Sequence, residues 1–130
     1  MQTHSKKQLW AGRVLSGLAV AFLLMDGITK LIQLTPVVAA TTQLGYDASA
    51  VVPIGVLVLV GTVLYCLPRT SVLGAIYLTG FLGGAIATHV RLSNPLFSHT
   101  LFPLYLAAFM WGGLLLRDTR LWSLLLPREA

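Results

Sequence analysis

Charged residues are scarce in this sequence, and their scarcity indicates the solvent in which the chain folds. Asp, Glu, Lys and Arg make up only 10% of its 130 residues, whereas 56% are hydrophobic. A typical soluble domain carries about 25% charged residues, so a soluble globule is excluded. The apolar residues lie in long blocks rather than in heptads or short repeats, which excludes coiled-coil, collagen-like and disordered chains. We therefore expect a single integral membrane domain over residues 1–130.

Cysteine is represented only by Cys66, which excludes an internal disulfide, a CxxC redox pair and a cysteine zinc site. The nine Lys and Arg residues stand singly at the ends of apolar runs, without the basic stripe typical of nucleic-acid binding. No nucleophile has a base beside it, and no metal-ligand spacing or phosphate-binding glycine loop is present. We therefore expect no nucleic-acid partner, no metal and no covalently bound cofactor.

Four apolar runs are long enough to cross a bilayer, because ~30 Å of hydrocarbon requires about 20 helical residues. None of them alternates polar and apolar residues, so helices are expected rather than barrel strands. The sequence therefore predicts an all-α fold, a bundle of four transmembrane helices. Their expected bounds are 9–34, 48–67, 71–90 and 100–116.

Two shorter segments have the features of helices at the membrane surface. Thr35 suits an N-cap, Pro36 the first helical position and Gly45 the position just after a helix. These signals predict a short interfacial helix over residues 36–44, between the first two spans. Residues 121–126, which include a tryptophan, are expected to form a second interfacial segment.

Small residues recur at helical spacing in two of the spans. Gly80 and Gly84 form a GxxxG motif in the third span, and Gly17 and Ala21 are spaced likewise in the first. Such rows let membrane helices approach closely, where no hydrophobic effect operates between them. We expect packing inside the bundle from these rows, with a homo-oligomer through Gly80 and Gly84 as the alternative.

The positive charges predict the orientation of the spans. With four spans, both termini and the second loop share one side of the membrane, and that side carries seven of the nine cations. Cytoplasmic loops are enriched in Lys and Arg, so both termini are expected in the cytoplasm. The seven residues are Lys6, Lys7, Arg13, Arg69, Arg117, Arg120 and Arg128; Lys30 and Arg91 lie on the other side.

Six polar residues are expected near the outer side of the membrane. Asp26 and Lys30 are four residues apart in the first span, on one helical face. Ionisable groups inside a membrane are costly, usually face the bundle interior and often mark a functional site. We therefore predict a shared ligand-binding pocket. Its residues would be Asp26, Lys30, His89, Arg91, Asn94 and His99.

Four of these residues also have a simpler interpretation. Lys30 neutralises Asp26 and extends to the headgroups, while Arg91 and His99 each meet headgroups on their own. In the functional interpretation, His89 relays a proton or hydrogen-bonds a quinone oxygen, and Arg91 pairs with Asp26 or holds an anionic group. His89 and His99 also lie on different spans, which leaves a b-type haem as a minor alternative.

Several short segments together resemble those of the DoxX-like family of small bacterial membrane proteins, over roughly residues 11–127. The segments are Leu67-Pro68-Arg69-Thr70, Leu73-Gly74-Ala75, Thr79-Gly80, Leu82-Gly83-Gly84-Ala85, Thr88-His89-Val90-Arg91, Pro95-Leu96-Phe97 and Leu116-Arg117-Asp118. The resemblance implies a four-helix membrane bundle. It also implies an association with redox systems, because the wider family is named for a subunit linked to a thiosulfate:quinone oxidoreductase and other relatives associate with redox partner proteins. Lys30, His89 and Arg91 match polar positions of the family.

These observations give three functional hypotheses. The first is a quinone- or lipid-binding subunit of a membrane redox system, which works with a partner protein that carries the redox cofactor. The second is a self-sufficient enzyme, an isomerase or reductase of a hydrophobic substrate, with Asp26 or His89 as acid or base. The third is a structural or assembly factor without a pocket. The first is preferred, and independent catalytic activity is not expected.

Overall fold

The computed structural model describes residues 5–118 and 120–125, and this part of the chain is helical without strands. The prediction of an all-α fold is therefore confirmed. Its elements in chain order are α1 (Lys6–Leu31), α2 (Thr35–Gln43), η1 (Ala48–Ala50), α3 (Val51–Cys66), α4 (Ser71–Arg91), η2 (Leu96–Thr100), α5 (Phe102–Arg117) and α6 (Arg120–Leu125).

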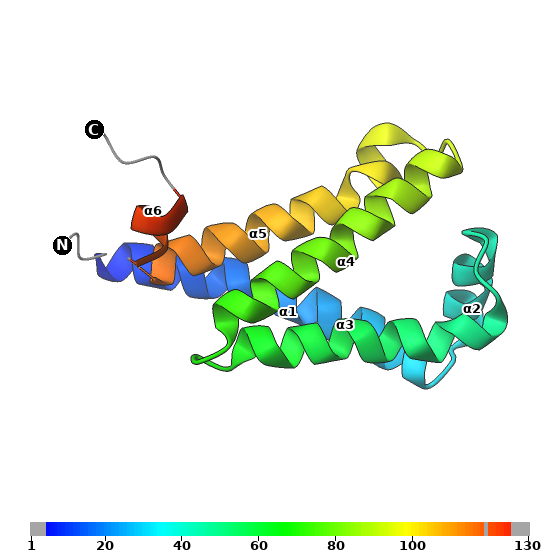
Figure 1. The fold of residues 1–130 in the computed structure, drawn as a ribbon, viewed down its shortest axis with the longest axis horizontal. Coiled ribbons are helices and arrows are strands. Elements are labelled where there is room, and N and C mark those ends of the chain that lie inside the picture. The colour runs from blue at the N-terminus through cyan, green and yellow to red at the C-terminus, as the bar shows by residue number, and fades with distance from the viewer. Residues whose placement is uncertain (1–4, 119, 126–130) are drawn as a thin grey trace.

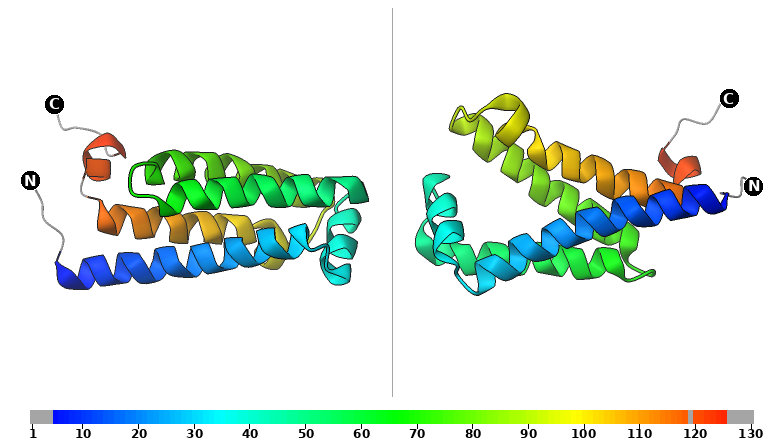
Figure 2. Two further views of the ribbon diagram at one scale, coloured as in Figure 1. Left: turned by 90° about the horizontal axis from the view of Figure 1, so that it is seen from below. Right: turned by 180° about the vertical axis from the view of Figure 1, so that it is seen from behind.

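Four long helices pack in a ring, in which each neighbours two others and runs antiparallel to both (Figure 1). Helix α1 packs against α3 and α5, and α4 packs against the same two helices. The start of α1, the turn from α3 to α4 and the end of α5 lie together at one end, here called the terminal end. The opposite end, where α2 and η2 lie, is called the distal end. Helices α4 and α5 diverge from α3 and α1 toward the distal end (Figures 1 and 2).

Four helical segments of the described chain are long and apolar enough to cross a membrane. They cover Lys6–Leu31, Ala48–Cys66, Ser71–Arg91 and Leu96–Arg117. The first three agree with the predicted spans to within a few residues. The fourth begins four residues before the predicted 100–116, because residues 96–100 form a π-helical turn that continues into α5. Pro95 directly precedes this turn, and Pro103 stands in the first turn of α5, where no N–H donor is needed.

The two surface segments are also helical. Helix α2 lies crosswise over the distal end, near the predicted 36–44, and Pro36 occupies its first turn (Figure 2). Helix α6 covers most of the predicted 121–126, whose last residue lies outside the described chain. Leu121 is buried, and the indole nitrogen of Trp122 donates to the carbonyl of Leu115 at 3.0 Å. These contacts hold α6 against the end of α5.

Glycines allow the helices to pack closely, but these are not the glycines of the predicted GxxxG motif. A Cβ atom on Gly113 would lie 2.8 Å from the Gly12 carbonyl, where α5 crosses α1. A Cβ on Gly55 would lie 3.0 Å from the Gly27 carbonyl, where α3 crosses α1. Side chains larger than hydrogen do not fit at such crossings, so these glycines allow the backbones to meet.

The expectation that Gly80 and Gly84, or Gly17 and Ala21, mediate internal packing is wrong. A Cβ on Gly17, Gly80 or Gly84 would meet nothing within 4 Å, and all three glycines are exposed. Ala21 is exposed as well. The spacing of small residues shows that they share a helix face, but it does not show which face the bundle buries.

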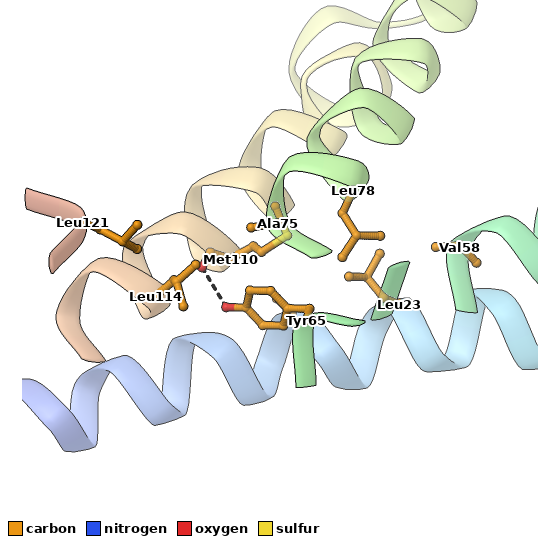
Figure 3. Close-up of a cluster of buried hydrophobic side chains, with 9 residues drawn as sticks. Leu23, Val58, Tyr65, Ala75, Leu78, Met110, Leu114 and Leu121 are labelled. Atoms are coloured by element: carbon orange, nitrogen blue, oxygen red, sulfur yellow. Dashed lines mark hydrogen bonds between the residues drawn. The ribbon is translucent and has the colours of Figure 1, made fainter. Parts of the chain in front are cut away.

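Hydrogen bonds join three helices at the terminal end of the core. The hydroxyl of Tyr65 on α3, which lies among buried hydrophobic side chains, donates to the carbonyl of Met110 on α5 at 2.7 Å (Figure 3). The same hydroxyl lies 2.7 Å from Oγ of Ser16 on α1, and all three residues are buried. The guanidinium of Arg117 lies over the Tyr65 ring, 5.8 Å from its centre. Because buried hydrogen bonds in an apolar medium are costly to break, this cluster fixes the register of α1, α3 and α5.

Candidate ligand-binding site

A cavity of about 550 Å³ opens between the four long helices in the distal half of the bundle. Most of its lining is apolar, and it includes Phe22 of α1, Leu57 of α3 and Leu106 of α5. Gly80 and Gly84 contribute bare backbone from α4, so the two glycines enlarge the cavity instead of closing a helix contact. Ligand pockets for molecules of drug size typically measure about 300–1,000 Å³ and are mostly apolar with a few polar groups.

An ion pair forms one polar part of the cavity wall. Nζ of Lys30 donates to Oδ1 of Asp26 at 2.6 Å, and both residues line the cavity. The pair follows from the sequence, because residues four apart on a helix lie on the same face. The side chain of Lys30 is 12% exposed and that of Asp26 is 33% exposed. The two charges cancel, so this wall presents a strong dipole and hydrogen-bonding atoms without a net charge.

His89 forms the second polar part of the wall, from the last turn of α4. The side-chain amide nitrogen of Asn94 lies 2.8 Å from Nδ1 of His89. The chain reaches this position through Ser93, whose φ of 55° is left-handed, and the backbone N–H of Asn94 donates to the His89 carbonyl at 3.1 Å. With the amide as donor, Nδ1 accepts and the proton of a neutral His89 is on Nε2. Asn94 therefore positions the ring and its second nitrogen.

His99 lies beside this pair but does not line the cavity. Its ring centre is 6.1 Å from that of His89, and the rings meet edge to face. Nδ1 of His99 is 2.8 Å from Oγ of the adjacent Ser98. Within residues 5–118 and 120–125, no three His, Cys, Asp or Glu residues gather closely enough to hold a metal ion.

Arg91 closes the distal end of the cavity rather than lining it. Its Nη2 donates to the carbonyl of Leu44 at 2.6 Å, just after α2. Gly45 follows with a φ of +95°, and a Cβ there would lie 2.6 Å from the same Nη2. Next to it, the hydroxyl of Tyr46 lies 3.1 Å from Oγ1 of Thr88 on α4. We call residues 44–46 the strap, because these two contacts fasten the chain after α2 to the end of α4.

The comparison with protein families agrees with this architecture. A model of the DoxX-like family matches residues 14–113, which is most of the chain and includes every residue that lines the cavity. The chain belongs to the DoxX-like family. Together with its four apolar helices, this membership identifies a multi-pass integral membrane protein. No curated protein and no solved structure matches the chain.

The six predicted site residues of this DoxX-like protein occupy different positions. Asp26, Lys30 and His89 line one cavity and come from two helices that are diagonal in the ring. Asn94 and Arg91 act from outside the lining, the first through His89 and the second through the strap. His99 contacts the imidazole of His89 only edge to face.

Sequence reasoning missed most of the cavity wall of the DoxX-like chain. Phe22, Phe102 and Leu106 line it, and they were not singled out. The rings of Phe22 and Phe102 pack together with centres 4.9 Å apart, between α1 and α5. In a membrane helix all faces are apolar, so hydrophobicity does not distinguish side chains that face the interior from those that face lipid. The one available signal was the Leu44-Gly45-Tyr46 segment, where Gly45 marks a tight turn.

Proposed function

We propose that the protein binds a quinone or a lipid in the distal cavity and serves a membrane redox system as its binding subunit. The observation that carries this proposal is the chemistry of the wall, which combines a large apolar surface with the Asp26–Lys30 pair and His89. A ligand that fits such a wall is amphipathic: its apolar part displaces lipid or water from the cavity, and its polar part meets the charged residues. The existence of this cavity disfavours an assembly factor without a pocket.

The charges of the wall favour a neutral head group. Lys30 is the only cation among the lining residues that the structure describes, and its ammonium already pairs with Asp26 at 2.6 Å. An anionic phospholipid head would have to compete with Asp26 for it, and would meet the repulsion of that carboxylate. A quinone carbonyl is neutral and accepts a hydrogen bond, which Nε2 of His89 supplies. A quinone therefore agrees with the wall better than a phospholipid does.

A redox role requires a partner protein in this proposal. Reducing a quinone to a quinol takes two electrons and two protons, and the chain has a single cysteine, exposed at the end of α3. One thiol does not make the dithiol–disulfide couple that supplies two electrons. The electrons would therefore come from a partner with its own redox cofactor, and His89 would carry protons to or from the ligand.

The charge distribution supports a cytoplasmic membrane location with the terminal end in the cytoplasm. Lys6, Lys7, Arg13, Arg69, Arg117 and Arg120 lie toward the terminal end, whereas Lys30 and Arg91 lie toward the distal end. The cavity would then open in the outer half of the bilayer. Reporter fusions at residue 47 and after the C-terminus test this orientation, and an external C-terminus would overturn it.

Binding of decylubiquinone to the purified protein in nanodiscs tests the proposed function. We expect saturable binding to the wild type, and a loss of about tenfold in affinity for His89→Ala, as for one lost hydrogen bond in an apolar site. His99→Ala is the matched control, because it removes an imidazole next to the cavity that does not line it. No saturation of the wild type, or equal affinities of the His89→Ala variant and the wild type, would count against the proposal.

Two other outcomes distinguish the alternatives. A phospholipid that remains bound through purification, detected by mass spectrometry, and that decylubiquinone does not displace would identify the cavity as a lipid site. Turnover of a lipid by the isolated chain would favour the self-sufficient enzyme, with Asp26 or His89 as acid or base.

A further inference from the structure

We propose that the ligand reaches the cavity sideways from the bilayer, through an opening between the distal halves of α3 and α4. This inference rests on the proposed ligand-binding function and adds the route and the class of ligand. Three sides of the cavity decide it, namely its distal end, the side between α1 and α5, and the side between α3 and α4.

The strap covers the distal end, where a ligand from water would have to enter. Leu44 and Tyr46 both line the cavity. Arg91 holds the Leu44 carbonyl at 2.6 Å, and Thr88 holds the Tyr46 hydroxyl at 3.1 Å. A hydrogen bond from a charged donor is about twice as strong as a neutral one, so the strap resists opening toward water.

Aromatic rings cover the side between α1 and α5. Phe22 and Phe102 come from these two helices, and both line the cavity. Their ring centres are 4.9 Å apart with an interplanar angle of 58°, which is favourable aromatic contact. Toward the terminal end, the crossing of Gly12 and Gly113 brings the same two helices into backbone contact.

The side between α3 and α4 lacks such a cover. Leu57 of α3 lines the cavity and yet is 49% exposed. Gly80 and Gly84 of α4 line it as well, are exposed, and have no neighbouring atom within 4 Å of a Cβ position. Phe102 and Tyr46 also line the cavity and are 37% and 39% exposed, but Phe102 packs on Phe22 and Tyr46 is held by Thr88. Leu57, Gly80 and Gly84 form an uncovered rim. Since helices α3 and α4 lie in the bilayer, this rim opens to lipid.

This geometry defines the ligand class as an amphiphile whose polar group is in the cavity and whose tail extends past α4 into the bilayer. Asp26, Lys30 and His89 lie on the walls of α1 and α4, whereas Leu57, Gly80 and Gly84 on the rim between α3 and α4 carry no polar side-chain atom. A tail longer than the 550 Å³ cavity holds is therefore tolerated, because its remainder stays in lipid. The bare backbone at Gly80 and Gly84 admits a flat or branched group close to the helix.

Thiol labelling in liposomes tests the route without any ligand. In a Cys66→Ala background, Leu106→Cys places a thiol in the cavity wall on α5. We expect N-benzylmaleimide, which dissolves in the bilayer, to label it readily, and a charged methanethiosulfonate to label it slowly. Adding Gly84→Leu blocks the rim and should slow the maleimide reaction about tenfold.

Gly83→Leu is the matched control, because Gly83 neighbours Gly84, is equally exposed and free of contacts, and does not line the cavity. It should leave the labelling rate unchanged. Arg91→Ala should release the strap and raise labelling by the charged reagent. Equal maleimide rates for the Gly83→Leu and Gly84→Leu variants, or fast labelling by the charged reagent with the strap intact, would overturn the route.

Two further arrangements keep the test decisive. If the Leu106→Cys variant does not fold, Ala85→Cys places the thiol in the same cavity by a small substitution, with Gly80→Leu then serving as the block. The labelling experiment and the binding experiment can fail independently. Labelling from the lipid side without decylubiquinone binding would support the route and contradict the proposed function, and binding without such labelling would do the opposite.

Discussion

The side-chain amide nitrogen of Asn94 lies 2.8 Å from Nδ1 of His89 and so fixes which nitrogen of the ring carries the proton. His89 lines the cavity, whereas Asn94 does not. The relationship makes Asn94 a positioning residue: it acts on a ligand only through the imidazole. A neutral His89 held in this way presents an Nε2–H donor, which suits a carbonyl oxygen.

Asn94→Asp should reverse this arrangement. A carboxylate accepts from Nδ1–H, so the neutral ring would lose its proton on Nε2 and with it the donor to a carbonyl. We expect decylubiquinone affinity to fall about tenfold, and nitrogen-15 shifts of His89 to report the changed tautomer without ligand. Asn94→Ala should leave His89 as a mixture of tautomers and should reduce the decylubiquinone affinity less than Asn94→Asp does. If the nitrogen shifts of Asn94→Asp and wild type coincide, Asn94 does not position the ring.

Breaking the Asp26–Lys30 pair should destabilise the bundle. Lys30→Met leaves the Asp26 carboxylate in an apolar wall without its 2.6 Å partner. Because both side chains are only partly exposed, we expect a loss of about 1–3 kcal/mol in the free energy of unfolding, measured in mixed micelles. The double variant Asp26→Asn/Lys30→Met should recover most of it. If the double variant instead loses as much free energy of unfolding as Asp26→Asn and Lys30→Met together, the two residues are not coupled.

Two glycines should respond oppositely to the same substitution. A Cβ on Gly113 would lie 2.8 Å from the Gly12 carbonyl, so Gly113→Ala should force α1 and α5 apart at a cost of about 1–3 kcal/mol. Gly83 has no neighbour within 4 Å of its Cβ position. Gly83→Ala should therefore be neutral, or stabilise its helix by up to about 1 kcal/mol. Unfolding in mixed micelles measures both, and equal losses would contradict the packing described.

Acidification should loosen α6 from the terminal end. Hydrogen bonds from Arg120 to both Asp118 oxygens, at 3.0 and 3.1 Å, hold the pKa of the Asp118 carboxyl below its usual value of 3.8. A lowered pKa in the folded state contributes stability that is present above about pH 4 and lost as the pH falls through the folded pKa. Trp122 fluorescence, taken as the difference from Trp122→Phe, should change over that range. Arg120→Gln should move this change to higher pH.

The sequence predicted the spans well because a bilayer imposes a length and a hydrophobicity that few segments satisfy. Thr35 with Pro36 marked the start of α2. The start of the last span was predicted too late, because Ser93-Asn94-Pro95 is typical of a loop, whereas the backbone forms a π turn directly after Pro95. Proline excludes a hydrogen-bond donor at one position, and it does not exclude a helix that begins there.

The candidate site was predictable only in its charged part. Asp26, Lys30 and His89 are conspicuous because ionisable residues are rare in membrane helices. The contacts of Arg91 with Leu44, and of Tyr46 with Thr88, join segments more than forty residues apart and follow from the packing of α2 over the bundle. No local pattern contains that information. The glycines illustrate the same limit, since Gly84 and Gly113 differ only in what the fold places opposite them.

The hydroxyl of Tyr65 gathers α1, α3 and α5 at the terminal end, while the helices separate toward the other end. The terminal end is thus held by buried hydrogen bonds, whereas at the distal end two contacts of exposed groups tie the strap to α4. A ligand bulkier than the cavity would therefore be accommodated by separating the distal ends of the helices and breaking the strap contacts, with little change around Tyr65.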